Sequence, residues 1–377
     1  MKCCIALICS LLLSTQAHGA QPAVLIGPDL EPKAVNLDEV SLADEGLIRL
    51  RLNSGLTAPL NDKQYVARLV DGQTLVGTLL GVGEGGESIR LAFGYEQRTV
   101  VLPLDELLSF TLVGHSLASD ASDDMVLLAT GEKLVGFVDS VGKDSIGFVV
   151  GDADDPIQIP MERIRGFSIA NKPEPVKVRK GLVRVQLRGG SLLYLRDASM
   201  KRVEGKADRV LEGTFILEPE TAPIALPLNY VQLIEPVSDR YALHSLTAFE
   251  MATVDGGEVF GVKMPPKAEG QGRIRLHAPT TLGFDLPKGA SRVAFTAALD
   301  LGEDIPDARR KLAGCELIVY DGDERIGGCT LTHAGPPQRL NLPLTGGQLR
   351  IELDPGVNGP VLDRVVLTDA ELLVSEQ

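Results

Sequence analysis

The segment VARLVDGQTLVG, which begins at Val66, sets the expected architecture of the first 240 residues because it recurs twice along the chain. A close copy, VLLATGEKLVG, begins at Val126, and a looser copy, VRVQLRGGSLLY, begins at Val183. The turn glycines of the three copies are evenly spaced, at intervals of 59 residues: Gly72, Gly131 and Gly190. A unit repeated at a fixed interval predicts tandem copies of one small structure.

Each copy ends on a second signature, an aliphatic residue and a proline followed by apolar residues four and seven positions later. The three prolines are Pro103, Pro160 and Pro227. Because proline has no N–H to donate to a strand ladder, the signature predicts a strand that stops, one tight helical turn, and a final strand. Alternating runs such as residues 88–93 and 145–150 lie between the signatures. Together they predict about five short strands per copy.

This layout resembles that of Sm-like barrels, in which a short helical turn joins the last two strands. The resemblance implies three small barrels, over residues 61–114, 124–170 and 178–238. Residues 21–60 precede them as an extended arm with one predicted strand, at residues 47–52. We expect that strand to cover an edge of the first barrel.

The first 20 residues predict export. Lys2 precedes an apolar run over residues 3–13, and small and polar residues follow as far as Ala20. This is the pattern of a secretory signal peptide cleaved near Ala20, and it predicts a periplasmic or secreted protein. An uncleaved anchor is the alternative, but the run is shorter than the ~20 residues that span a bilayer. No later segment is long and apolar enough, so no transmembrane segment is expected in the mature chain.

Composition excludes several function classes. The 37 Lys and Arg against 51 Asp and Glu leave a net charge of −14, which disfavours nucleic acid as a partner. Aromatic residues make up 4% of the chain and tryptophan is absent, so a broad stacking platform is not expected. The chain lacks the Gly-x-Ser-x-Gly, His-Glu-x-x-His and Walker motifs. These observations favour a protein that is not an enzyme and needs no cofactor.

The repeat disappears after about residue 240, where longer alternating runs begin. About eight such runs, separated by turn signals, lie between residues 240 and 377. They predict a β-sandwich of the jelly-roll type. The expected fold class is therefore all-β: three tandem Sm-like barrels followed by a jelly roll.

Several of these runs resemble the NPCBM family of carbohydrate-binding modules. The segments that carry the resemblance are residues 274–279, 282–286, 292–300, 318–322, 346–353 and 363–372. The resemblance implies a sandwich that binds a glycan. The family usually has a tryptophan in the segment that matches residues 363–370, and this chain has Val365, Val366 and Leu367 there.

Five residues of this region are the candidate ligand contacts: His277, Asp321, Asn358, Asp363 and Arg364. For His277 the structural alternative is favoured, in which a histidine at a strand end bonds a backbone carbonyl and fixes the turn. Asp354, Asn358 and Asp363 are the candidates for a structural calcium ion, because Ca²⁺ prefers oxygen ligands. Hydrogen bonds to a glycan, or an ordinary solvated turn, are the alternatives for these three residues.

Two cysteines follow the signal segment, Cys315 and Cys329. The Asp321-Gly322 pair between two extended runs predicts a hairpin. If that hairpin folds about Gly322, the two thiols face each other across it, and a disulfide is plausible in an oxidising compartment. Two free buried thiols are the equal alternative.

The preferred function is therefore that of an exported, non-catalytic binding protein. The C-terminal domain would bind a glycan, and the barrels would serve as spacers or protein-contact modules. The rival interpretation is a scaffold of the cell envelope whose partners are other proteins. An enzyme with a site between domains is a third alternative.

Overall fold

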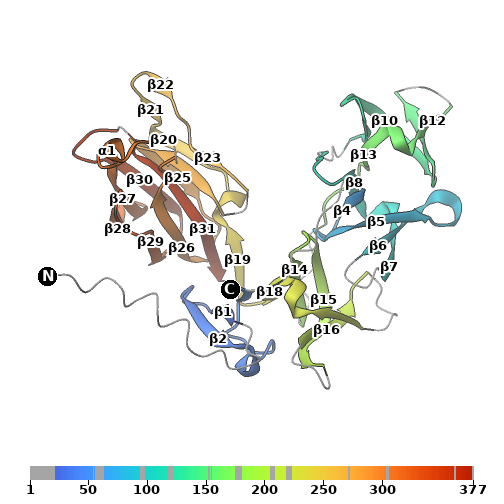
Figure 1. Cartoon of the computed structure of the whole chain (residues 1–377), viewed down its shortest axis with the longest axis horizontal. Helices are drawn as coiled ribbons and strands as arrows, with labels where there is room; N and C mark the ends of the chain where they lie inside the picture. The colour runs from blue at the N-terminus through green and yellow to red at the C-terminus, as the bar shows by residue number, and fades with distance from the viewer. Residues whose placement is uncertain are drawn as a thin grey trace. The chain divides into compact units, whose positions relative to one another are not determined.

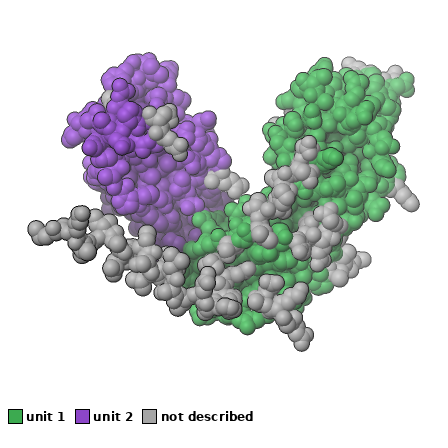
Figure 2. Space-filling view, viewed as in Figure 1, with its two compact units in different colours: residues 1–25, 33–237 green, residues 26–32, 238–377 purple. Residues whose placement is uncertain are grey.

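The computed structural model describes residues 22–53, 55, 63–93, 98–117, 122–151, 153, 155–174, 181–203, 209–217, 223–270, 272–302, 305–360 and 362–375. The chain forms two compact units (Figures 1 and 2). Unit 1 comprises residues 1–25 and 33–237, and unit 2 comprises residues 26–32 and 238–377. The predicted all-β class is confirmed, since strands dominate the described residues and the helix α1 (Asp307–Arg310) has four residues. No helix in the described ranges is both long and apolar enough to cross a membrane. The predicted signal peptide lies outside these ranges.

Three repeats of five strands follow one another in unit 1, as predicted. Each has a 3-10 turn between its fourth and fifth strands. Repeat 1 contains β4 (Gln64–Leu69), β5 (Thr74–Val82), β6 (Ser88–Phe93), β7 (Arg98–Pro103), η3 (Leu104–Glu106) and β8 (Leu107–Leu112). Repeat 2 contains β9 (Asp124–Leu128), β10 (Lys133–Val141), β11 (Ser145–Val150), β12 (Ile157–Pro160), η4 (Met161–Arg163) and β13 (Ile164–Ser168). Repeat 3 contains β14 (Leu182–Leu187), β15 (Leu192–Arg202), β16 (Arg209–Phe215), β17 (Ile224–Pro227), η5 (Leu228–Tyr230) and β18 (Val231–Pro236).

The same hydrogen bonds recur in all three repeats. The last strand pairs with the first, and the first four strands pair in succession. The turn glycines have φ angles of +85°, +89° and +89°, in the left-handed region that strains other residues. Two residues before each glycine, a backbone N–H donates to the last carbonyl of the 3-10 turn: Val70 to Glu106 (2.9 Å), Ala129 to Arg163 (2.8 Å) and Arg188 to Tyr230 (2.9 Å). The threefold duplication is therefore present in the backbone, while the Sm-like identity stays a resemblance.

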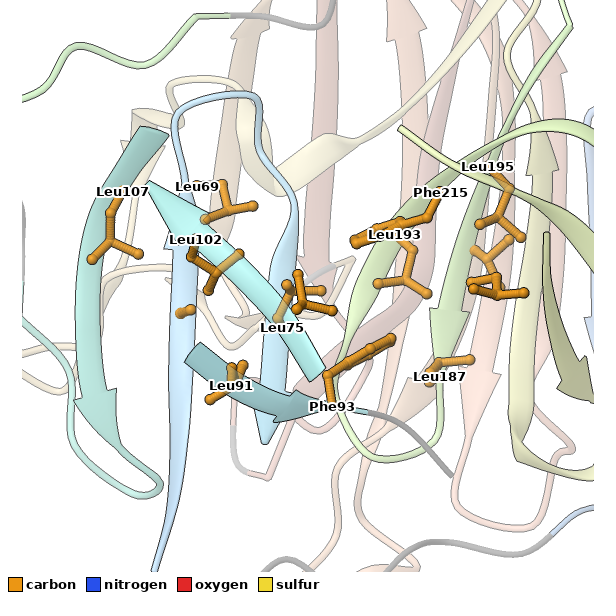
Figure 3. Close-up of a cluster of buried hydrophobic side chains, with 14 of the residues drawn as sticks. Leu69, Leu75, Leu91, Phe93, Leu102, Leu107, Leu187, Leu193, Leu195 and Phe215 are labelled. Atoms are coloured by element: carbon orange, nitrogen blue, oxygen red, sulfur yellow. The ribbon is translucent and has the colours of Figure 1, made fainter. Parts of the chain in front are cut away.

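The three repeats do not form separately closed sheets, which corrects the expected independence of the barrels. The last strands of repeats 1 and 2, β8 and β13, pair antiparallel with Phe110 opposite Phe167. Repeats 1 and 3 meet where Thr74 of β5 pairs with Leu192 of β15. Their buried side chains form one continuous cluster, part of which is drawn in Figure 3. Sharing a core lets small sheets bury more apolar surface than each could bury alone.

The predicted N-terminal arm of one strand is wrong in two respects. It contains three strands, β1 (Pro22–Ile26), β2 (Pro32–Asn36) and β3 (Arg49–Leu52). The strand predicted at residues 47–52 pairs with β18 of the third repeat, not with the first barrel. Glu235 of β18 fixes this edge, because its carboxylate accepts from Arg49 Nε and from Arg184 Nη1, each at 2.6 Å.

Unit 2 is the predicted sandwich of two antiparallel sheets. The β31 sheet contains β19 (Tyr241–Ser245), β23 (Lys267–Ala268), β24 (Ile274–His277), β26 (Ala290–Leu299), β29 (Gln338–Pro343) and β31 (Arg364–Ser375). The β30 sheet contains β20 (Ala252–Gly256), β25 (Thr280–Asp285), β27 (Gly314–Asp321), β28 (Glu324–Thr332) and β30 (Gln348–Pro355). A two-stranded hairpin, β21 (Glu258–Val259) and β22 (Val262–Lys263), is separate. Alternate residues of both sheets fill one core, as period-two burial requires.

Residues 26–32 pack on unit 2 although they belong to the N-terminal part of the chain. Leu30 is fully buried, and its carbonyl accepts from Arg339 Nη2 at 3.1 Å. Asn341 Nδ2 donates to the Asp29 carbonyl at 2.7 Å. Both Arg339 and Asn341 lie on β29, so this segment covers part of the β31 sheet.

The two cysteines are not opposite each other, which corrects the predicted register. Cys329 pairs with Leu317, and Cys315 pairs with Leu331. Asp321 pairs with Glu324, so the turn falls on Gly322 and Asp323, and a bulge between Val319 and Tyr320 shifts the ladder by one more residue. Both cysteines are free thiols in the structure, in agreement with the alternative to the disulfide.

Candidate functional site

Four of the five predicted contact residues lie at one end of unit 2, around the buried carboxylate of Asp363. Its two oxygens accept from the backbone N–H groups of Gly314 (2.9 Å) and Gly356 (3.3 Å). Its own carbonyl accepts from the Ala278 N–H at 3.0 Å. Burial raises the pKa of Asp363, while the two N–H donors and His277 lower it. Asp363 therefore joins three backbone segments, which is a structural role.

His277 takes the structural role favoured from the sequence. The residue is 8% exposed, and its Nδ1 donates to the Ala278 carbonyl at 2.8 Å. Thr280 Oγ1 in turn donates to the His277 carbonyl at 2.5 Å, which fixes the turn between β24 and β25. A side chain so covered offers little surface to a ligand, so the candidate ligand role of His277 is not supported.

Cys315 and His277 each lie near Asp363, and Cys, His and Asp are the residue types of a cysteine nucleophile and its partners. Burial, with Asp363 and Cys329 nearby, raises the pKa of Cys315 to about 12. A catalytic cysteine needs the opposite shift, because the thiolate is the nucleophile. Burial likewise raises the pKa of Cys329. The arrangement favours inert thiols that pack as small hydrophobic groups.

Asp354, Asn358 and Arg364 lie exposed on the rim at this end. Asn358 Nδ2 donates to the Leu312 carbonyl at 3.1 Å, which positions its amide at the surface. Of the three predicted calcium ligands, Asp363 already has both carboxylate oxygens accepting from backbone N–H groups. In the part of the chain that the structure describes, no three His, Cys, Asp or Glu side chains are placed to hold a metal.

Asp321 is separated from the other four predicted contacts. It ends β27, while Cys315 lies near the start of that strand, so they are roughly 20 Å apart at ~3.3 Å per residue. Asp321 Oδ2 accepts from both the backbone N–H and the hydroxyl of Thr345, each at 2.6 Å. Asp321 is buried and holds the loop after β29, so it is not placed to contact a ligand.

The outward-facing side of the β30 sheet carries a row of polar groups, of which the sequence analysis singled out Asp354 alone. Leu317 and Val319 of β27 point into the core, so Glu316 and Tyr320 point outward. Arg350 lies opposite Tyr320 in the ladder, with its guanidinium carbon 4.2 Å from the ring centroid. Cation–π contact of this kind orients both side chains.

The same row continues along the strands toward the rim. Arg325 Nη2 donates to Glu316 Oε1 at 2.9 Å, and these side chains remain 54% and 45% exposed. Glu316 lies opposite Asp354 of the rim, and Glu352 lies opposite Ile318. We call this surface, Glu316, Tyr320, Arg325, Arg350, Glu352 and Asp354, the β30 face. It combines two guanidinium groups, three carboxylates and one phenol on one side of the sandwich.

A groove of about 750 Å³ lies in unit 1, lined by repeats 1 and 3 and by the segment that follows β13. Its walls combine aliphatic side chains with four carboxylates and two cations: Asp71, Asp105, Glu106, Glu174, Lys172 and Arg196. Burial raises the pKa of Glu106, and the charges of Asp105 and Asp71 raise it further. Asn171 is anchored at the wall, because its Nδ2 donates to the carbonyls of Leu104 (2.9 Å) and Leu107 (2.8 Å).

The sequence carried part of the signal for this groove. Asp71 precedes a turn glycine, and Glu106 ends a predicted helical turn. Their closeness follows from the hydrogen bond between the Val70 N–H and the Glu106 carbonyl, which no local pattern reveals. The β30 face gave a weaker signal, because period-two alternation shows that a side chain points outward but not what lies beside it.

No family model and no curated protein matches the chain. Similar solved structures include the CBM51-2 and INT domains of ZmpB from Clostridium perfringens, at 13% identity and TM-score 0.28, covering 51% of this chain and 40% of that one. CBM51 from the Clostridium perfringens GH95, in complex with methyl-galactose, has 16% identity and TM-score 0.26, with coverage of 35% and 99%. The tandem CBM51 modules of Sp3GH98 from Streptococcus pneumoniae have 10% identity and TM-score 0.28, with coverage of 93% and 88%. The chain thus spans less than half the length of the first of these. At these TM-scores the functional inference depends on the chain's own geometry.

Proposed function

We propose that this chain is an exported, non-catalytic binding protein whose unit 2 binds a glycan on the β30 face. The observation that carries the proposal is the accessible Arg325–Glu316 ion pair beside Tyr320 and its stacked Arg350. Sugar hydroxyls both donate and accept hydrogen bonds, and planar carboxylate and guanidinium groups match pairs of them. Tyr320 adds an apolar ring with a polar tip at the centre of the row.

Two further observations support this assignment. Residues 26–32 contact β29 of the β31 sheet, whereas Glu316 and Arg325 on the β30 sheet remain 45% and 54% exposed. The sequence resemblance to the NPCBM family falls on this same unit. The raised pKa of Cys315 supports the non-catalytic part of the proposal.

The proposal is tested with the chain from residue 21 onward, which keeps every described residue. It is screened on a glycan array, and any ligand found is titrated calorimetrically. We expect Tyr320→Ala and Arg350→Ala each to weaken binding by about tenfold or more, the usual cost of truncating a central contact. Arg273→Ala is the matched control, since this exposed arginine of unit 2 precedes β24 in the other sheet. An array without a ligand, or a ligand indifferent to both substitutions, would contradict the proposal.

A second candidate is the envelope scaffold that binds other proteins, and the groove in unit 1 favours it. Its four carboxylates suit a polypeptide segment that carries Lys or Arg. If this is the main function, a Glu106→Gln and Asp71→Asn double variant captures less of its envelope partners, and added sugars do not compete. Unchanged capture by the variant would remove the groove as the contact site.

A further inference from the structure

Side chains at the same end of each of the three repeats differ sharply in their exposure to solvent. Phe93 of repeat 1 and Phe215 of repeat 3 are 2% and 1% exposed. The residue at the same position of repeat 2, Val150, is 39% exposed. Phe93, Val150 and Phe215 are equivalent because each lies opposite the residue five positions after the turn glycine of its own repeat.

A second position repeats this contrast. The fourth strand of each repeat ends on a proline. The residues three positions before these prolines are Val100, Ile157 and Ile224. Val100 and Ile224 are 0% and 6% exposed, whereas Ile157 of repeat 2 is 48% exposed. The chain therefore places apolar side chains at this end of every repeat but covers them in only two.

Repeats 1 and 3 cover each other at this end through equivalent residues. Gln73, just after its turn glycine, accepts from the Tyr194 N–H at 2.8 Å. Ser191, just after the corresponding glycine, accepts from the Val76 N–H at 3.0 Å. The two contacts are related by a local twofold, since Val76 and Tyr194 occupy the same position of their repeats. The rings of Phe93 and Phe215 stack across it, with centroids 6.1 Å apart (Figure 3).

In repeat 2 the same end is an apolar surface within the described residues. Val150 of β11 and Ile157 of β12 form this surface, while Val135 and Phe137 of β10, 49% and 60% exposed, project from the opposite face of the sheet. Exposed apolar patches of this kind mark interaction sites on soluble proteins.

We propose that a second copy of this chain covers this end, with repeat 2 of one copy packed on repeat 2 of the other as repeats 1 and 3 pack within one chain. An interface between equivalent surfaces is self-complementary, which a twofold homodimer requires. Glu132 takes the place of Gln73 and Ser191, so its carboxylate would accept from the Val135 N–H of the second copy.

The charged residues near this end are also compatible with a second copy of the chain. The ladder between Thr74 and Leu192 would become Lys133 opposite Lys133 of the second copy. Like charges directly opposite are unfavourable, but the twofold also brings Glu132 of each copy beside Lys133 of the other. The neighbouring acidic and basic residues thus form two complementary pairs. The patch is small, so we expect a dissociation constant in the micromolar range.

The test is sedimentation equilibrium of the chain from residue 21 onward, over about 1 to about 100 µM. We expect a monomer–dimer equilibrium. Val150→Lys and Ile157→Lys each put a charge into the proposed interface and should weaken the dimer by about tenfold or more. Val101→Lys, at a 45% exposed position of β7 in repeat 1, is the matched control and should leave the equilibrium unchanged. All three positions are exposed, so circular dichroism should show the same fold.

A gain-of-association variant adds a test in the opposite direction. Val150→Phe would restore, across the dimer, the stacked pair that Phe93 and Phe215 form within the chain. It should tighten the dimer by about 3- to 10-fold. A chain that stays monomeric at every concentration overturns the proposal. A dimer whose stability is unchanged by both lysine substitutions overturns it as well.

Discussion

Repeat 2 and its two neighbours have the same strand order, the same turn glycine and the same 3-10 turn, yet they differ at one end. Repeats 1 and 3 bury Phe93 and Phe215 against each other, whereas Val150 of repeat 2 is exposed. The core of each small sheet is therefore incomplete by itself. Burial at this end depends on what the repeat meets and not on the fold of the repeat.

The largest expected difference in stability between repeats is at the position that Phe215 occupies in repeat 3 and Val150 occupies in repeat 2. Phe215→Ala should lower the free energy of unfolding of unit 1 by about 3–5 kcal/mol, because it removes a buried ring from the shared core. Val150→Ala at the equivalent position should cost under about 1 kcal/mol, since that side chain is already partly in water. Urea unfolding followed by circular dichroism, at a concentration where the chain is monomeric, measures both. Equal losses would contradict the comparison.

The next largest effect on stability is expected at the hydrogen bond between Gln73 of repeat 1 and Tyr194 of repeat 3. Gln73 is fully buried, and Gln73→Ala leaves the Tyr194 N–H without its acceptor. A buried donor left unpaired costs about 1–3 kcal/mol. Glu132→Ala, the exposed equivalent in repeat 2, should change the stability of the monomer by less than about 0.5 kcal/mol. The same unfolding experiment compares them, and a costly Glu132→Ala would show that repeat 2 is already covered within the chain.

The turn glycines should behave alike in covered and uncovered repeats. Gly72 and Gly131 both have φ near +90°, and a methyl group added at either position would meet no other atom within 4 Å. Substitution by alanine should therefore cost about 1 kcal/mol at each, from backbone strain alone. Hydrogen exchange of the flanking strands reports each turn separately. A much larger loss at one of them would break the equivalence of the repeats.

The smallest effect is a pH dependence limited to repeat 1. The pKa of Glu106 is raised above 4.5 by burial and by Asp105 and Asp71, so the folded chain holds this proton more tightly than the unfolded chain. Its contribution to stability is complete at low pH and is lost as the pH rises through the raised pKa. Glu106→Gln should match the wild type well below pH 4.5 and become slightly more stable above it. Arg163→Gln, the equivalent change in repeat 2, should show no such gain, and thermal unfolding across pH distinguishes them.

Local signals predicted much of the fold. The turn glycines, the prolines and the alternating runs placed five strands in each repeat, because each reflects a restriction on a few neighbouring residues. Register was harder: the turn falls on Gly322 and Asp323, and the bulge between Val319 and Tyr320 adds one more residue, so Cys329 lies opposite Leu317. A single inserted residue changes every pair beyond it, and nothing in the hairpin sequence announced it.

For the candidate site residues, too, local patterns predicted one part and long-range contacts decided the rest. Asp363 and His277 were recognised as polar residues near turns, but their hydrogen bonds go to backbone groups, and those of Asp363 come from distant segments. Tyr320 and Arg350 of the β30 face were not singled out, since they are 30 residues apart and meet through strand pairing. Pairing between strands is a long-range choice that residue patterns constrain only by face.

Residue patterns alone establish the all-β class, the threefold repeat and the sandwich that follows it. These depend on backbone conformations that glycine, proline and alternating side chains favour within a few residues. Long-range packing settles which edges pair, where β3 lies and which repeat keeps an apolar end in contact with water. Those outcomes depend on contacts between segments that are far apart in the chain. The hydrophobic effect favours any apolar contact, so it does not by itself determine which surfaces pack together.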